Sequence, residues 1–235
     1  MRHSRKQENQ RSSFKKAGKF KVLLASTLLP MLIMLVVWYF MDTFPFGRNT
    51  LMAVDFGQQY IGLYGFLKAT VLTGDWSGLF YSFSKSIGGA MIGIWGFNLI
   101  SPFNLFYILF PLTQFKWAVF LTIWLRYGAM GLSFAYLLIK RYKALSYNPW
   151  LVPLMATAYA LSGMIVSYQM NPIFYDAMIM LPLVIISLEE LIDGRKPFKY
   201  IIVLALTMLL YGLHDLFVRC PLYLLLCSTE VGRNR

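Results

Sequence analysis

Asp55, Gln58 and Gln59 belong to a polar, glycine-containing segment that lies between two long apolar stretches. Positions three and four residues apart share one face of a helix, so Asp55 and Gln59 can present a single polar surface. A carboxylate in this setting could act as a general base or as a ligand for a divalent cation. It could equally cap an interfacial helix, and the residues alone leave both interpretations open.

Lys85 lies in a second polar segment, Ser-Lys-Ser-Ile-Gly-Gly, which ends at Gly89. The backbone of such a segment could turn around an anion, with Lys85 as the counter-charge. The spacing is not that of a nucleotide-binding phosphate loop, and on spacing alone a plain flexible turn is the favoured interpretation.

Two more charged residues lie in or beside apolar stretches. Arg126 falls inside the stretch 117–139, and a charge within a membrane segment usually has a partner or a function. Arg126 could bind a phosphate or a carboxylate in a cavity, pair with an acid on a neighbouring helix, or extend toward the membrane surface. Asp176 opens another apolar stretch, where an acid can simply offset the helix dipole.

Composition predicts a multi-pass α-helical membrane protein. Hydrophobic residues make up 58% of the chain, charged residues 14%, and the mean hydropathy is +0.57. Soluble domains carry roughly 25% charged residues. The net charge of +12 does not indicate a nucleic-acid partner, because the basic residues gather at the ends of apolar stretches. Cys220 and Cys227 suggest neither a disulfide framework nor a metal site.

The basic tail 1–21 precedes an apolar run at 22–41, which is long enough to cross about 30 Å of hydrocarbon. We interpret 22–41 as the first transmembrane helix, with the N-terminus in the cytoplasm and the tail attracted to lipid headgroups. The next basic cluster, at 140–143, is also inside only if an odd number of spans lies between the outer end of this first helix and the cluster.

Two apolar stretches, 89–110 and 117–139, lie before that cluster. The first is interrupted by glycines and by the step from Ser101 to Pro102, so we interpret it as re-entrant or interfacial. Residues 42–116 then form an extracytoplasmic loop, and residues 117–208 form further transmembrane helices. These helices are expected at 117–139, 151–168, 177–191 and from residue 200 onward. Asp55, Lys85 and Asp176 would all lie outside.

Five sequence blocks in this order resemble the YfhO-like family of bacterial membrane proteins. They are Asp55-Phe-Gly-Gln-Gln-Tyr60, Leu79-Phe-Tyr-Ser-Phe-Ser-Lys-Ser-Ile-Gly-Gly89, Ser101-Pro-Phe-Asn-Leu105, Ala158-Tyr-Ala-Leu-Ser-Gly163 and Tyr175-Asp-Ala-Met-Ile-Met-Leu-Pro182. Each block alone is a weak signal, but the set in order is specific. The resemblance covers residues from about 20 to 208.

The resemblance implies an all-α, GT-C-like membrane bundle, here in truncated form. Such enzymes move a sugar from a polyprenyl-phosphate carrier to an acceptor outside the cell, here a cell-envelope polymer of the teichoic-acid type. They place a catalytic acid in the first outer loop and often a second in the next, which are the places of Asp55 and Asp176. By this analogy Asp55 would deprotonate the acceptor hydroxyl or hold a metal. Lys85 and Arg126 would bind the lipid phosphate, and Gln58 and Gln59 would help to bind substrate.

The last segment, 209–235, departs from the family, because His214, Asp215 and Arg219 interrupt an expected span. Several codons can encode each residue of this segment, and we chose one set among them. Read in another frame, these codons encode the family-like span Asn-Tyr-Tyr-Met-Gly-Phe-Met-Ile-Cys. Our hypothesis is a frameshift near Met208 that leaves the polypeptide truncated and inactive, and sequencing the gene across that codon tests it.

Two other functions remain open. A transporter or flippase for a lipid-linked sugar would use the interrupted segment and Arg126 without a catalytic acid. A non-catalytic membrane subunit would assemble with a separate transferase.

Overall fold

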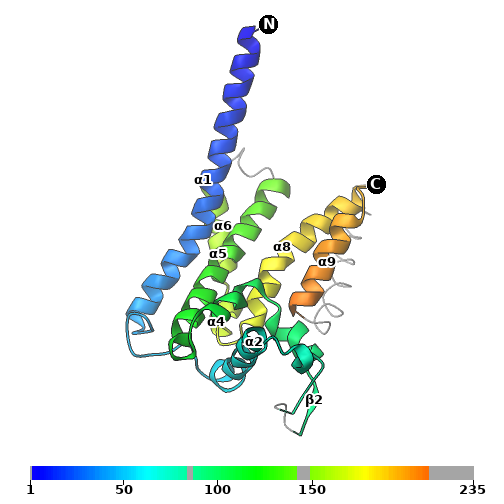
Figure 1. Cartoon of the computed structure of the whole chain (residues 1–235). Helices are drawn as coiled ribbons and strands as arrows, with labels where there is room; N and C mark the ends of the chain where they lie inside the picture. The colour runs from blue at the N-terminus through cyan, green and yellow to red at the C-terminus, as the bar shows by residue number, and fades with distance from the viewer. Residues whose placement is uncertain (1, 84–86, 142–148, 212–235) are drawn as a thin grey trace.

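The computed structural model is almost entirely helical and describes residues 2–83, 87–141 and 149–211 (Figure 1). The long helix α1 (Arg2–Phe40) projects beyond the other helices at its N-terminal end. Among the described residues, Gly18–Phe40 and Leu112–Arg141 are helical stretches long and apolar enough to cross a membrane. Leu151–Ser167 and Phe198–Leu210 are shorter apolar helical stretches.

The centre of the bundle is α5 (Phe115–Arg141), which packs against α1 along much of its length. Two glycines of α5 make this close packing possible. A Cβ at Gly131 would lie 2.2 Å from the carbonyl oxygen of Ser26, and one at Gly128 would lie 2.5 Å from the sulfur of Met31. Small residues that let two helices approach are typical of helix packing in membranes. The indole nitrogen of Trp124 donates to the Met31 carbonyl at 3.1 Å and ties the two helices together.

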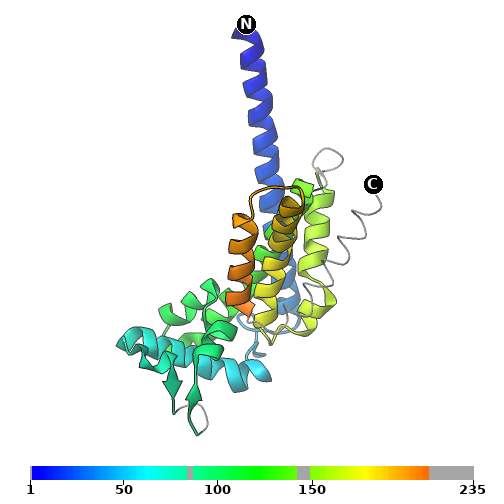
Figure 2. The same cartoon turned by 90° about the vertical axis from the view of Figure 1, so that its right-hand side faces the viewer.

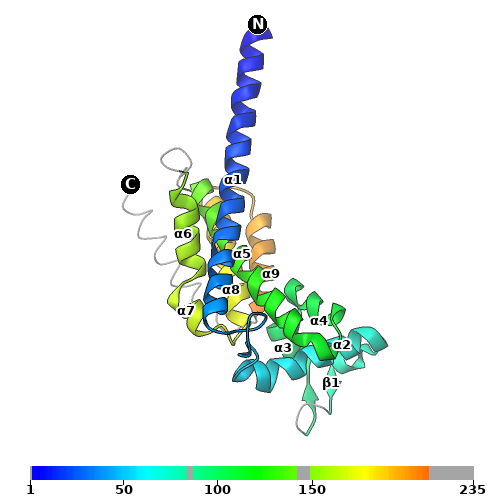
Figure 3. The ribbon, with the colours of Figure 1, turned by 90° about the vertical axis from the view of Figure 1, so that its left-hand side faces the viewer.

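Four further helices complete the bundle over the described residues. They are α6 (Leu151–Ala160), α7 (Gly163–Ser167), α8 (Ile173–Ile192) and α9 (Phe198–Tyr211). α6 packs against both α1 and α5, α8 packs against α5, and α9 packs against α8 (Figure 3). The helix expected at 151–168 is split in two, because Ser162 adopts an extended backbone with ψ of 146° between α6 and α7.

A layer of short elements lies at the end of the bundle away from the N-terminus, displaced to one side (Figure 2). In chain order it contains η1 (Phe56–Tyr60), α2 (Ile61–Thr73), η2 (Trp76–Leu79), β1 (Tyr81–Ser82), β2 (Gly89–Ala90), α3 (Ile92–Ile94), η3 (Trp95–Leu99), η4 (Pro102–Asn104), α4 (Leu105–Leu109) and η5 (Leu112–Gln114). β1 and β2 pair antiparallel, with Tyr81 opposite Ala90.

The stretch 89–110 is thus a chain of short elements, and none of them is long enough to cross a membrane. Its C-terminal end is fixed by Lys68 of α2, whose ammonium donates to the carbonyls of Ile108 at 2.8 Å and Phe110 at 2.7 Å. These carbonyls at the end of α4 would otherwise lack helical partners, so a cation there satisfies them and offsets the helix dipole.

The largest group of buried side chains joins the short elements to the bundle. Tyr64 of α2 stacks on Tyr107 of α4, with ring centroids 3.9 Å apart. Trp38 of α1 packs against Phe120 and Tyr127 of α5. The layer of short elements is therefore packed on the helices and can hold polar side chains in fixed positions.

Candidate functional site

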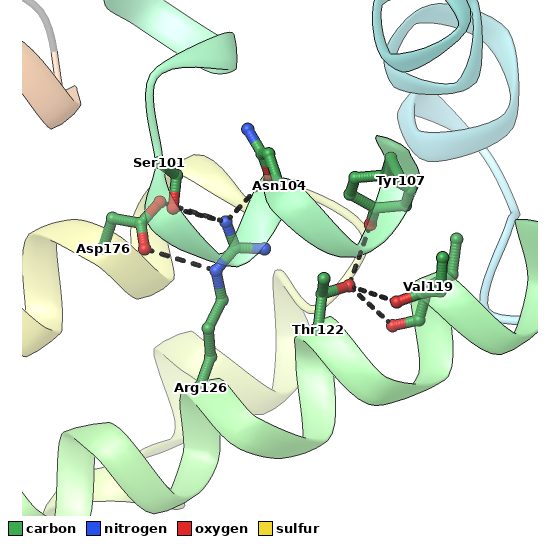
Figure 4. Close-up of polar contacts among 8 residues, drawn as sticks. Ser101, Asn104, Tyr107, Val119, Thr122, Arg126 and Asp176 are labelled. Carbon is green, nitrogen blue, oxygen red and sulfur yellow. Dashed lines mark hydrogen bonds and ion pairs between the residues drawn. The ribbon is translucent and has the colours of Figure 1, made fainter. Parts of the chain in front are cut away.

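Arg126 and Asp176 form a buried ion pair between α5 and α8 (Figure 4). The Arg126 Nε lies 3.2 Å from Oδ1 of Asp176, and Nη2 lies 3.1 Å from Oδ2. The two side chains are only 1% and 6% exposed, so the contact is shielded from solvent. The two-point geometry matches the planar guanidinium to the planar carboxylate, which is the strong form of this interaction.

The interrupted segment supplies two more acceptors to the same guanidinium. Nη2 donates to the Ser101 hydroxyl at 3.0 Å and to the Asn104 side-chain oxygen at 3.4 Å (Figure 4). Ser101 is extended because Pro102 follows it, and this bend turns the chain from η3 into η4. The Phe103 ring lies 5.1 Å from the guanidinium carbon. Arg126 therefore joins α5, α8 and the η4 turn at one point.

Tyrosines occupy the space beside this pair. The Tyr107 hydroxyl lies 2.9 Å from the Thr122 hydroxyl, which in turn donates to backbone carbonyls of its own helix. Tyr60, at the end of η1, is also buried. The pKa of Tyr60 is raised to about 12, mainly by burial and also by the charge of Asp55, whereas the charge of Arg126 opposes this shift. Tyr60 thus lies within electrostatic range of both charged residues.

Asp55 lies on an exposed turn that leads into η1. Gln58 and Gln59 are also exposed, whereas Phe56 and Tyr60 are buried and anchor the turn. Within the part of the chain that the structure describes, the Asp55 carboxylate makes neither a hydrogen bond nor an ion pair. The preceding residue, Val54, has a φ of 51°, which is unusual for a β-branched residue and marks local strain.

Sequence comparison decides the family. The model of a bacterial membrane protein family, YfhO, matches residues 26–210, which is most of the chain. This chain belongs to the YfhO family. Its two long apolar helices agree with a membrane protein. Comparisons with curated proteins and with solved structures give no match.

In this YfhO-family protein the predicted site residues fall into two groups. Asp55, Gln58 and Gln59 share an exposed surface, and Arg126 and Asp176 share a buried contact. In the second group, Arg126 pairs with an acid on a neighbouring helix, which is one of the alternatives considered for it above. Each oxygen of Asp176 accepts a hydrogen bond from Arg126, and the Asp176 side chain is only 6% exposed. The catalytic role of Asp176 and the phosphate-binding role of Arg126 stay predictions.

Ser101 and Asn104 accept hydrogen bonds from Arg126, although sequence reasoning did not select them as site residues. Two polar residues within an apolar stretch are the signal that could have identified them, since buried polar groups need partners. Lys85, His214, Asp215, Arg219 and the two cysteines lie outside the described residues.

A metal site is not formed by the described residues, among which no three His, Cys, Asp or Glu side chains lie close enough together to hold an ion. The role of Asp55 as a ligand for a divalent cation therefore stays a prediction.

Proposed function

We propose that this YfhO-family chain carries the first-loop part of a membrane glycosyltransferase. The enzyme would transfer a sugar from a polyprenyl-phosphate donor to a cell-envelope polymer of the teichoic-acid type outside the cell. The observation that supports this best is Asp55. It is an exposed carboxylate on a turn held by two buried aromatic residues, directly after the first apolar helix.

In the proposed step Asp55 accepts the proton of the acceptor hydroxyl as that oxygen bonds to the anomeric carbon of the sugar. The bond from this carbon to the phosphate oxygen breaks, and polyprenyl phosphate leaves with the electron pair. A positioned general base typically contributes about 10²- to 10⁴-fold to such a rate. Gln58 and Gln59 offer exposed amide groups beside Asp55 that can hydrogen-bond to sugar hydroxyls.

Besides the catalytic and phosphate-binding roles predicted for Asp176 and Arg126, their buried pair has a positioning role in this proposal. Their pair holds the η4 turn against α5 and α8. The same segment continues into α4, where Tyr107 stacks on Tyr64 of α2, the helix that follows directly on η1. The buried pair thus supports the surface that presents Asp55.

The test of the enzyme proposal is Asp55→Asn, which keeps the size of the side chain but removes the base. We expect sugar transfer to fall at least about a hundredfold. The variant is made in a family member that carries the same Asp-Phe-Gly-Gln-Gln-Tyr block, because the frameshift hypothesis above expects this chain itself to be inactive. The readout is the sugar content of the envelope polymer, normalised to the amount of protein in the membrane.

The matched control is Asp75→Asn. Asp75 is an exposed acid in the same outer layer, and its carboxylate accepts hydrogen bonds from the backbone and hydroxyl of Ser77. This change should weaken one local hydrogen-bonded cap and leave sugar transfer unchanged. Full transfer by Asp55→Asn would contradict the enzyme and favour a lipid-linked sugar transporter or a non-catalytic subunit. A co-purifying protein that carries all the activity would identify the subunit case.

The proposed membrane topology has several spans and a cytoplasmic N-terminus. Figure 1 shows the N-terminus, the C-terminal end of α5 and the connection between α8 and α9 toward one end of the molecule, with the layer of short elements at the other. The first end carries the basic residues Lys140, Arg141, Arg195, Lys196 and Lys199, as expected for cytoplasmic loops.

Cysteine labelling measures this topology directly. In a background with Cys220 and Cys227 replaced by serine, Gln58→Cys should react with a membrane-impermeant maleimide in intact cells. Lys196→Cys should react only after the membrane is permeabilised. Labelling of Lys196→Cys in intact cells would show that the orientation is reversed.

A further inference from the structure

Three cations converge on one carboxylate where α5, α8 and α9 come together. We call Lys140, Glu190, Arg195 and Lys199 the basic hub. Lys140 contacts Oε1 of Glu190, and Arg195 approaches the same oxygen at 3.3 Å. Lys199 lies 2.7 Å from Oε2. The hub lies at the end of the molecule where α5 ends and α8 connects to α9 (Figures 1 and 2).

The hub has an uncompensated positive charge that faces solvent. Three positive side chains meet one carboxylate, which leaves an excess of two positive charges. The Glu190 side chain is 13% exposed, whereas those of Lys140, Arg195 and Lys199 are 32%, 65% and 46% exposed. The Glu190 carboxylate is therefore more deeply buried than the three cations, which face the solvent. The neighbouring pair of Arg141 and Glu189 is neutral and does not reduce the excess.

Helix α1 adds a further cation beside the hub. The ammonium groups of Lys19 and Lys140 lie 5.9 Å and 5.8 Å from the centroid of the same ring, that of Tyr136. The basic surface thus extends from α9 across α5 to α1. The apolar stretches of α5 and α1 that end there are long and apolar enough to cross a membrane.

An apolar stripe begins at the hub. Ile202, Leu206 and Leu209 follow Lys199 at intervals of three, four and three residues, which keeps them on one face of α9. These three side chains are 58%, 45% and 45% exposed. A cationic end followed by an exposed apolar stripe matches a molecule with an anionic head and a hydrocarbon tail.

We propose that the basic hub binds the phosphodiester group of an anionic phospholipid, with one acyl chain along the stripe of α9. The ammonium and guanidinium groups donate charge-assisted hydrogen bonds to the phosphate oxygens. Glu190 holds the three cations together and limits the affinity, because it neutralises part of their charge. A soluble phosphate ester would offer the same anionic group, but it would leave the apolar stripe without a role.

Binding is measured on the full chain in detergent micelles, with phosphatidylglycerol that carries a fluorescent acyl chain as the probe and anisotropy as the readout. Each surface cation contributes roughly a fivefold change in affinity for an anionic lipid. We therefore expect Lys199→Gln and Arg195→Gln each to weaken binding about fivefold. Lys199→Arg, which keeps the charge, should restore it.

Glu190→Gln gives the decisive comparison. It raises the excess charge of the hub and should tighten phosphatidylglycerol binding about fivefold. If Glu190 and its partners only held the helices together, this variant would weaken binding as Lys199→Gln does, and the proposal would be overturned. Equal binding of phosphatidylcholine would overturn it as well.

Two controls separate the hub from general charge effects and from soluble anions. Lys116→Gln removes an exposed cation at the opposite end of α5 and should leave binding unchanged. An equal loss in this variant would contradict a defined site. Glycerol phosphate at equal concentration should fail to displace the probe, and displacement by it would assign the hub to a soluble phosphate ester instead.

Discussion

Arg126→Met is expected to lower the free energy of unfolding by about 3–5 kcal/mol, the usual loss when one member of a buried ion pair is removed. The change leaves the Asp176 carboxylate, which is 6% exposed, without its counter-charge. It also removes the donor to the Ser101 hydroxyl and to the Asn104 side-chain oxygen, so three buried residues lose a hydrogen bond together.

The measurement is thermal or denaturant unfolding in detergent micelles, and the readout is the fraction of protein that stays monodisperse. Arg126→Met combined with Asp176→Leu should recover much of the loss, because a well-packed apolar pair can replace a buried ion pair. Lys116→Met, which removes an exposed cation from the same helix, serves as the control. If Arg126→Met unfolds like the unmodified protein, the buried pair is not formed.

Gly131→Leu is expected to separate α1 from α5 and to produce the second large loss of stability. Even the Cβ of alanine would lie 2.2 Å from the Ser26 carbonyl oxygen, a backbone atom that cannot rotate away. Overpacking of this kind typically costs about 1–3 kcal/mol, and the larger leucine should lie at or above the upper end. The same unfolding measurement applies, with Gly131→Ala as the intermediate case.

Two other glycines provide the controls. In Gly128→Ala the new Cβ would lie 2.5 Å from the sulfur of Met31, whose side chain is flexible. This variant should therefore lose less free energy of unfolding than Gly131→Ala. Gly62 lies in α2, and a Cβ added at this position has no neighbouring atom within 4 Å outside the backbone of its own helix. Alanine should stabilise that helix by about 0.5–1 kcal/mol. If Gly131→Ala and Gly62→Ala lost the same free energy of unfolding, the close packing of α1 on α5 would not be the cause of the loss at Gly131.

Long apolar stretches are the part of the fold that the sequence predicts well. The stretches at 117–139 and 177–191 correspond to α5 and α8 within a few residues. Length and apolar composition are local properties, so a single stretch carries the signal by itself. The split between α6 and α7 was missed, because an extended Ser162 between two apolar segments leaves little trace in composition.

The partners of polar side chains are the part that the sequence leaves open. Arg126 could be recognised as a charge that needs a counter-ion, but Asp176 lies 50 residues further along the chain. Likewise, nothing around Lys68 in the sequence points to the carbonyls of Ile108 and Phe110. Such contacts depend on how the short elements pack on the bundle, and no periodic pattern encodes that packing.

The separation of Arg126 and Asp176 has a consequence for synthesis on the ribosome. At about 5–20 residues per second, Asp176 is made roughly 3–10 seconds after Arg126. During this interval an arginine near the middle of a span carries an insertion penalty of about 2.5–3.5 kcal/mol. In the topology proposed above, α5 must tolerate that penalty until α8 arrives. In that topology the assembly of the bundle has an order in time, because the insertion of α5 is completed only when α8 arrives.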